Sequence, residues 1–237
     1  MFHANQPSPY SPLTIGALLG WITAYFATPI LTSHCPPGSQ MAPVLGILLL
    51  PLCILSGILL AGVLSATQLS LREILRMRHP MPLSRRLPHA FLWAIVLFLL
   101  LQLGCGGFLQ WLLKLLGLAP SQQPLADFLK NNATNPIVLG AVFLSSCILS
   151  PISEELFYRR LLPQTFLHLG IPLFVVIPLV AMLFGIVHLL LWAFPGLFLF
   201  SLALSFTTWR HDLIQAILIH AGYNLLTLLS LLLAVLL

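Results

Sequence analysis

Charge is scarce in this sequence. Only 6% of its 237 residues are charged, and Asp and Glu together number five. Hydrophobic residues make up 59% of the chain, and the mean hydropathy is +1.03. This composition excludes a water-soluble globular domain and predicts an all-α, polytopic helical membrane protein. We see no internal repeat and no second domain, so we expect a single integral-membrane domain over residues 1–237.

Several other features are missing, and each absence excludes a class of protein. No basic stripe interleaved with aromatic residues lies outside the apolar segments, so nucleic acid is not an expected partner, and the net charge of +5 reports membrane topology instead. The N-terminus lacks the Lys/Arg region of a signal peptide, so we expect the first apolar segment to be retained. No CxxC spacing connects the four cysteines, which we interpret as small apolar fillers: Cys35, Cys53, Cys105 and Cys147.

Long apolar segments predict about six to eight transmembrane helices. The expected helices are Leu13–Leu31, Met41–Ala66, Ala90–Leu118, Pro136–His168, Pro172–Trp192 and Asp212–Leu237, with Leu197–Trp209 short for a full crossing. Pro151 and Pro163 are expected to kink the long helix Pro136–His168. Three glycines, Gly104, Gly106 and Gly107, predict a close helix-packing face.

Gln68–His89 is the one strongly polar loop. It holds five of the ten basic residues against one acid, Glu73. The positive-inside rule therefore places this loop and the N-terminus in the cytoplasm, and the loop Ala119–Asn135 outside. A patch for lipid headgroups is the alternative interpretation of the basic loop.

Two of the five acids, Glu154 and Glu155, stand side by side within the helix predicted for Pro136–His168. A carboxylate at bilayer depth costs several kcal/mol unless it is paired, hydrated or in use. Glu155 and Arg159 have the i,i+4 spacing of a helical ion pair, which could be purely structural. No Lys or Arg stands at that spacing after Glu154. Carboxylates in water-poor sites bind protons more tightly, which suits a general base or acid.

Further polar residues inside predicted helices are His188, His220 and Asn224. In a straight hairpin turning at Gly170, Glu154 precedes the turn by 16 residues and His188 follows it by 18. Their heights would then differ by only about 3 Å, and His220 would lie about 12 Å deep in the last helix. The three side chains are therefore expected at one buried level. Taken singly, each histidine could instead be an interhelical hydrogen-bond donor, and Asn224 a packing residue.

Three short motifs stand in order on successive predicted helices. They are Glu-Glu-x-x-x-Arg (Glu154, Glu155, Arg159), Phe-x-x-x-His (Phe184, His188) and His-x-x-x-Asn (His220, Asn224). This set resembles the CPBP family, the CAAX-protease and bacteriocin-processing intramembrane endopeptidases also called the ABI family, which includes the eukaryotic type II CAAX prenyl endopeptidase. The resemblance covers about residues 136–226, and the first three predicted helices match only as generic membrane helices.

The resemblance implies a buried polar cavity among the helices, with the catalytic helices within about residues 136–237. It implies that Glu154 activates a water together with His188, and that His220 and Asn224 stabilise the oxyanion. Glu155 and Arg159 would be the supporting pair.

No cofactor is expected, because the sequence lacks an HExxH motif and the resemblance favours a metal-free glutamate mechanism. Zinc is the alternative, with Glu154, His188 and His220 as ligands. The chain departs from the family pattern at Arg160, where Gly is common, and at Tyr158, where Phe is usual. Either change could alter packing or access at the mouth of the cavity.

The function that the resemblance implies is hydrolysis of a peptide bond near the membrane surface, with a membrane-bound peptide or protein as substrate. Processing of a CAAX prenyl protein, a leader peptide or a sorting signal would each fit, in the plasma (inner) membrane of a prokaryote. The alternatives are a non-catalytic bacteriocin-immunity or scaffold relative and a Glu/His proton-relay transporter. The complete motif set weighs against the first, and the missing internal repeat weighs against the second.

Overall fold

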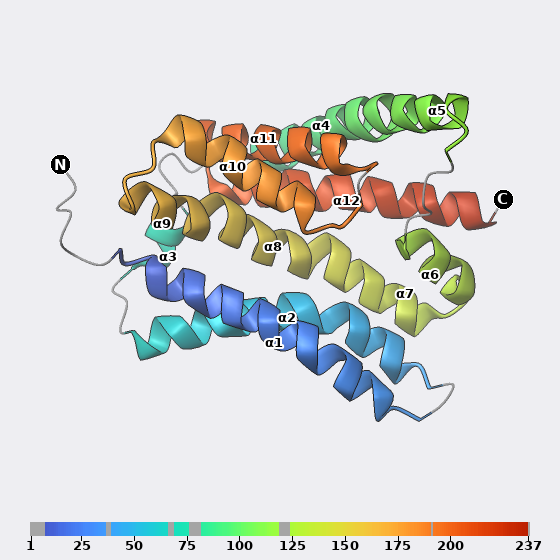
Figure 1. Cartoon of the computed structure of the whole chain (residues 1–237), viewed down its shortest axis with the longest axis horizontal. Coiled ribbons are helices and arrows are strands. Elements are labelled where there is room, and N and C mark those ends of the chain that lie inside the picture. Colours follow the sequence, from blue (N-terminus) through green and yellow to red (C-terminus); the bar gives the residue numbers. More distant parts are fainter. Residues whose placement is uncertain are drawn as a thin grey trace. The chain divides into compact units, whose positions relative to one another are not determined.

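A computed structural model describes residues 8–36, 39–65, 69–75, 82–118, 124–190 and 192–236, and within these ranges every regular element is a helix (Figure 1). The all-α polytopic membrane fold is therefore confirmed. Among the described residues, five helices are long and apolar enough to cross a membrane: Ser11–Ser33, Met41–Leu64, Leu83–Leu115, Pro136–His168 and Leu213–Val235. Leu173–Ile186 is a shorter apolar helix.

The helices form two compact units. One unit comprises residues 1–77 and 136–176, and the other comprises residues 78–135 and 177–237. Each unit thus combines two segments that are far apart in the sequence. The three sequence motifs are divided between the two units. Glu154 belongs to the first unit, whereas His188 and His220 belong to the second.

In the first unit, α1 (Ser11–Ser33) and α2 (Met41–Leu64) approach each other at backbone distance. A Cβ placed on Gly16 would overlap the carbonyl oxygen of Gly57, and one placed on Gly20 would overlap that of Cys53. Gly16 and Gly20 have the small-xxx-small spacing that permits such close packing in membranes. Next to this contact, the core of the unit is Leu13, Ala17, Ile54, Ile58 and Leu161.

The predicted helix Pro136–His168 is confirmed as one continuous helix of 33 residues. It consists of α7 (Pro136–Phe143), η2 (Leu144–Leu149), α8 (Ser150–Glu155), η3 (Leu156–Leu161) and α9 (Leu162–His168), where η marks a π-helical segment. Each of the last two π-helical segments precedes a proline near the start of the next α-helix, Pro151 or Pro163. A proline ring crowds the carbonyl four residues earlier, and a wider π turn relieves that crowding. The helix therefore continues through both prolines.

The second unit begins with a continuous helix made of α4 (Leu83–Leu97), η1 (Phe98–Gly106) and α5 (Gly107–Leu115). The predicted packing face on Gly104, Gly106 and Gly107 is wrong. Among the described residues, a Cβ on Gly104 or Gly106 would meet only a carbonyl oxygen of its own helix, and one on Gly107 would meet nothing. These glycines lie at the end of the π-helical segment, where the backbone turn is wider. The close approach in this helix is at Ala94, whose Cβ would stand 2.9 Å from a Cβ on Gly222.

The helix predicted for Pro172–Trp192 is shorter than expected. It is α10 (Leu173–Ile186), and the chain turns through Leu189, which has a φ of 54° and donates its N–H to the carbonyl of Ile186 at 3.0 Å. The side chain of Phe194 lies against Gly185, so the chain must reverse directly after α10. The next helix, α11 (Phe194–Arg210), starts three residues before the predicted Leu197, because Pro195 suits a first helical turn.

The remaining elements are short or terminal. The last helix is α12 (Leu213–Leu236), close to the prediction. The predicted external loop contains a helix, α6 (Pro124–Asn132), with Leu129 fully buried. The predicted cytoplasmic loop contains α3 (Leu71–Ile74), whereas its residues 68 and 76–81 lie outside the described ranges.

Candidate active site

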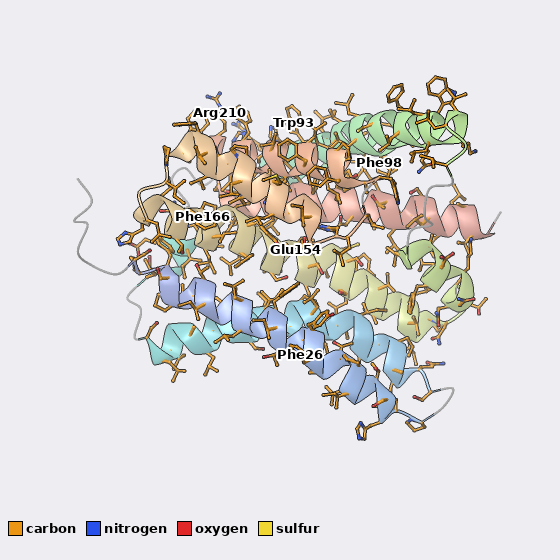
Figure 2. All side chains as sticks on the ribbon, in the orientation of Figure 1. Phe26, Trp93, Phe98, Glu154, Phe166 and Arg210 are labelled. Carbon is orange, nitrogen blue, oxygen red and sulfur yellow. The ribbon has the colours of Figure 1, made fainter. Side chains whose placement is uncertain are left out.

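The carboxylate pair ends α8, near the middle of the long helix (Figure 2). Glu155 is completely buried, and its Oε2 lies 3.1 Å from Nε of Arg159, which is 5% exposed. The predicted i,i+4 ion pair is therefore confirmed. Glu154 is half-buried. Because removing one partner leaves the other charge buried, the pair holds this part of the helix in one arrangement.

Arg160, the departure from the family pattern, is also buried, in η3. Its Nη2 donates to the hydroxyl oxygen of Tyr10 at 2.6 Å and to the backbone carbonyl of Glu73. Its guanidinium carbon lies 4.8 Å from the centre of the Tyr10 ring. Neighbouring arginines thus serve different partners: Arg159 binds a carboxylate of its own helix, and Arg160 binds two segments from the first third of the chain.

His188 lies in the turn after α10, where its side chain is exposed. Its Nδ1 is 2.7 Å from the backbone carbonyl oxygen of Phe184. A carbonyl oxygen can only accept, so Nδ1 carries the proton and the neutral ring keeps its lone pair on Nε2. Nε2 is therefore the atom that could take a proton or bind a metal ion.

His220 lies in α12 and is 3% exposed. Its ring centre is 6.1 Å from that of Phe184 and 5.1 Å from that of Phe200, with interplanar angles of 73° and 82°. The Phe184 ring is also 4.9 Å from the ring of His188. The structure therefore brings the two motif histidines to one shared neighbour, Phe184.

Asn224 follows His220 by one turn of α12, so the two share a face, and Asn224 is half-buried. The intervening Tyr223 packs on Phe200 with ring centres 4.4 Å apart, and its hydroxyl donates to Oε1 of Gln102 at 3.4 Å. Sequence reasoning missed Phe200 and Tyr223. Tyr223 stands inside the His-x-x-x-Asn motif, which could have indicated it, but no local pattern indicates Phe200.

Glu154, Glu155 and Arg159 belong to the first unit, whereas both motif histidines and Asn224 belong to the second. The meeting of Glu154 with His188 stays a prediction. Its argument from a straight hairpin no longer holds, because His188 lies in the turn beyond α10 and not within a helix.

Metal binding also stays a prediction. Within the part of the chain that the structure describes, no three His, Cys, Asp or Glu side chains gather to hold a metal ion. Of the three residues expected to bind zinc, His188 and His220 belong to the second unit and Glu154 belongs to the first. Two imidazoles and a carboxylate are a chemically suitable zinc set, so direct metal analysis is the test.

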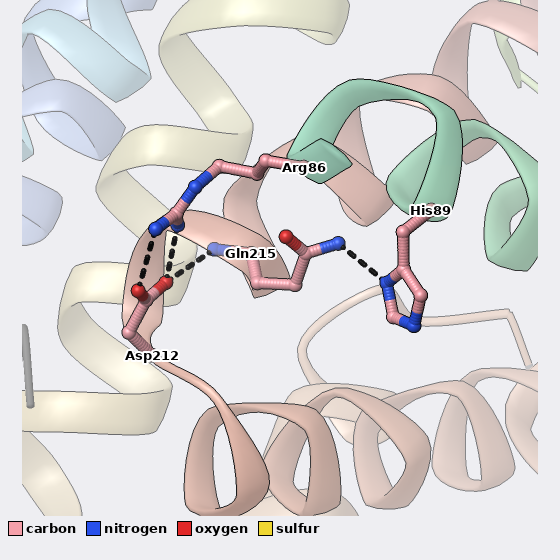
Figure 3. Close-up of polar contacts among 4 residues, drawn as sticks. All are labelled: Arg86, His89, Asp212 and Gln215. Atoms are coloured by element: carbon pink, nitrogen blue, oxygen red, sulfur yellow. Dashed lines mark hydrogen bonds and ion pairs between the residues drawn. The ribbon is translucent and has the colours of Figure 1, made fainter. Parts of the chain in front are cut away.

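A second polar cluster ties the start of α4 to the start of α12 (Figure 3). Arg86 Nη1 and Nη2 donate to the two carboxylate oxygens of Asp212 at 2.6 and 2.8 Å. Asp212 also caps α12, since its Oδ1 accepts the backbone N–H of Gln215 at 2.9 Å. The side-chain amide of Gln215 lies 3.0 Å from Nδ1 of His89.

This cluster fixes the start of the helix that carries His220 and Asn224. Sequence reasoning assigned Arg86 to the basic loop and gave His89 no role. The signal that could have found the cluster is the scarcity of acids, because Asp212 is one of only five and directly precedes an apolar helix.

Comparison with known proteins gives a family match over the segment of the chain that carries the three motifs. Residues 136–226 match the family described as type II CAAX prenyl endopeptidase Rce1-like. The match covers the span over which the motifs predicted this resemblance, so the family expectation is confirmed there. No curated protein matches the chain, and no solved structure matches it.

Proposed function

We propose that this chain is an intramembrane endopeptidase that hydrolyses a peptide bond near the membrane surface, because residues 136–226 match the family described as type II CAAX prenyl endopeptidase Rce1-like. The observation that supports this proposal most is that the matched segment holds both motif histidines around Phe184. The same segment carries the carboxylate pair with its buried arginine.

The proposed chemistry begins with water. Glu154 accepts a proton from a water molecule, assisted by Nε2 of His188, and the water oxygen attacks the carbonyl carbon of the peptide bond. The carbonyl oxygen becomes an oxyanion, to which the ring N–H of His220 and the amide of Asn224 donate hydrogen bonds. The C–N bond then breaks, and the proton held by Glu154 passes to the departing amine. Water is consumed, and a carboxylic acid and an amine are released.

The surroundings of the histidines suit these roles. The bond from Nδ1 of His188 to the carbonyl of Phe184 orients the ring and leaves the lone pair of Nε2 to accept a hydrogen bond from the water that Glu154 deprotonates. His220 is buried between the rings of Phe184 and Phe200, where little water competes for its hydrogen bonds. Donors held in such a water-poor site stabilise a developing charge more strongly than exposed donors do.

We also propose that the chain lies in the inner membrane of a prokaryote with its N-terminus in the cytoplasm. In the first unit, Arg160 contacts Tyr10 near the N-terminus and the carbonyl of Glu73 in the basic loop. In the second unit, Arg86 at the start of α4 contacts Asp212 in the turn before α12. Each set of contacts agrees with the predicted topology, in which these termini and loops share one side of the membrane.

The test is cleavage by the purified protein in lipid vesicles. The substrates are a farnesylated CAAX peptide, the same peptide without the lipid, and a peptide with a hydrophobic leader. We expect mass spectrometry to find a new peptide end with the wild type and none with Glu154→Gln. Cleavage of all three substrates at equal rates by Glu154→Gln and wild type would contradict the proposal, as would no cleavage of any substrate by the wild type.

A further inference from the structure

Arg160 is a buried cation that joins three segments of the first unit. It extends from η3, donates to the hydroxyl of Tyr10, which directly precedes α1, and donates to the backbone carbonyl of Glu73 in α3. The contact with the face of the Tyr10 ring adds a cation–π interaction. We call these three residues the Arg160 clamp.

The partners of Arg160 are themselves held in place. The hydroxyl of Thr14 donates to the backbone carbonyl of Tyr10 at 3.0 Å and lies 2.9 Å from the hydroxyl of Thr165 in α9. The start of α1 is therefore joined to the long helix on both sides of Leu161.

Glu73 is held by a capping box. Its carboxylate accepts hydrogen bonds from the hydroxyl of Ser70 at 2.6 Å and from the backbone N–H of Ser70 at 2.8 Å. The hydroxyl of Ser70 in turn accepts the backbone N–H of Glu73 at 3.2 Å. The Ser70 bonds lower the pKa of the Glu73 carboxyl, and the nearby charge of Arg160 lowers it further. The carbonyl that Arg160 binds is thus part of an ordered turn.

The clamp acts on the segment that directly follows the carboxylates. η3 begins at Leu156, immediately after Glu155, and both Leu156 and Phe157 pack on the core formed with α1 and α2. Neighbouring helical residues point in different directions, so Arg159 and Arg160 restrain the helix on different sides. Rotation of this segment about its axis would break the clamp and would move the side chain of Glu154.

We propose that Arg160 is a positioning residue for Glu154, acting through its hold on Tyr10 and Glu73. The clamp sets the rotation of the long helix at the carboxylate pair. It makes Tyr10 and Glu73, which lie outside the family match, supports of the proposed site. The role in turnover rests on the proposed function, whereas the orientation of residue 154 can be measured without any cleavage.

The first experiment measures orientation alone. A cysteine is placed by Glu154→Cys in a background where the four native cysteines are alanine, and its alkylation by a maleimide is timed in lipid vesicles. We expect Arg160→Met to change the alkylation rate at least threefold, Tyr10→Phe to change it in the same direction, and Arg160→Lys to give a rate between those of Arg160→Met and the parent. Lysine keeps the positive charge and can still donate hydrogen bonds, but it loses the planar geometry of the guanidinium.

Ser145→Ala is the matched control. It removes the hydroxyl on the same long helix that donates to the backbone carbonyl of Ile47 at 2.9 Å but leaves the clamp, so it should lower stability without changing the alkylation rate. An unchanged rate in both Arg160→Met and Tyr10→Phe would overturn the proposal. Should Arg160→Met fail to accumulate, Tyr10→Phe decides the question, because it removes one hydroxyl and keeps the ring.

The second experiment measures turnover on a substrate that the wild type cleaves. We expect Arg160→Met to lower kcat about tenfold while KM changes by less than twofold, since a displaced base affects the chemical step. Arg160→Lys should recover part of kcat, and adding Tyr10→Phe to Arg160→Met should cause no further loss, because both act on one contact. A kcat equal to wild type in Arg160→Met would refute positioning. No cleavage by the wild type would refute the proposed function and leave the alkylation result intact.

Discussion

Arg86 and Asp212, 126 residues apart in the sequence, form a buried ion pair with two parallel hydrogen bonds of 2.6 and 2.8 Å. Their side chains are 5% and 3% exposed. The carboxylate that neutralises Arg86 also caps the helix that carries His220 and Asn224. One acidic side chain therefore joins the start of α4 to the start of α12. It also fixes where α12, the helix that carries the two proposed oxyanion donors, begins.

Replacing Asp212 by asparagine should strongly destabilise the protein. Asp212→Asn leaves the guanidinium of Arg86 buried without its counter-ion, at a cost of about 3–5 kcal/mol. The measurement is the free energy of unfolding in mixed micelles titrated with a denaturing detergent. Asp127→Asn is the control, because Asp127 and Lys130 are 3.6 Å apart with side chains 53% and 54% exposed. That exposed pair should contribute less than about 1 kcal/mol. Equal effects of the two substitutions would contradict the prediction.

The two adjacent carboxylates should separate by phenotype. Glu155→Gln leaves Arg159 buried without its charge partner. We therefore expect the free energy of unfolding to fall by about 3–5 kcal/mol and less of the protein to accumulate in cells. Glu154→Gln should accumulate and unfold like the wild type but lose turnover, because it keeps the shape and removes the base. Unfolding titrations and cleavage rates of both variants are the measurements. A stable Glu155→Gln together with an active Glu154→Gln would show that the assigned roles are wrong.

Loss of Asn224 should slow the chemical step. Asn224→Ala removes one of two donors proposed for the oxyanion, and such losses typically lower turnover by about 10²–10³. Substrate binding should change little, since the oxyanion exists only after attack. The measurement is the cleavage rate at saturating substrate. Thr227→Val is the control on the same helix, because it removes only a hydroxyl that donates to the nearby backbone carbonyl of Tyr223. A rate within about twofold of wild type for Asn224→Ala would remove the oxyanion role.

Activity should not need zinc. A carboxylate and an imidazole can activate water together, and the sequence has no HExxH motif. The measurement is elemental analysis of the purified protein alongside its cleavage rate, before and after chelation. One zinc ion per chain, with activity lost on its removal and restored by its return, would contradict this expectation and support Glu154, His188 and His220 as ligands.

Acidification should weaken the second unit through His211. Partial burial lowers the pKa of His211 below its usual 6.5, and the nearby His89, Arg210 and Arg86 lower it further, against the opposing effect of Asp212. The unfolded chain therefore binds a proton at a higher pH than the folded chain does, so stability falls as the pH drops below about 6.5.

The measurement for His211 is the unfolding midpoint between pH 7.5 and pH 5. His211→Asn should flatten this dependence, whereas His34→Asn, which changes an exposed histidine of the first unit, should leave it unchanged. A pH dependence that is the same in wild type and His211→Asn would refute the assignment.

What the sequence determined by itself is local. Apolar length and helical periodicity predicted the 33-residue helix Pro136–His168 and the ion pair between Glu155 and Arg159, because both follow from the geometry of one continuous helix. The same spacing placed His220 and Asn224 on one face. The order of the three motifs predicted the family that residues 136–226 match, since a motif is a property of the sequence and needs no fold to be found.

Tertiary structure decided the contacts between segments that are distant in the sequence. Neither helical periodicity nor composition pairs Arg86 with Asp212, Arg160 with Tyr10, or His220 with Phe200, because each pair depends on which helices pack together. The end of α10 at Ile186 was likewise decided by tertiary packing. The sequence there is apolar enough to continue as a helix, but the packing of Phe194 against Gly185 turns the chain and places His188 beyond the helix.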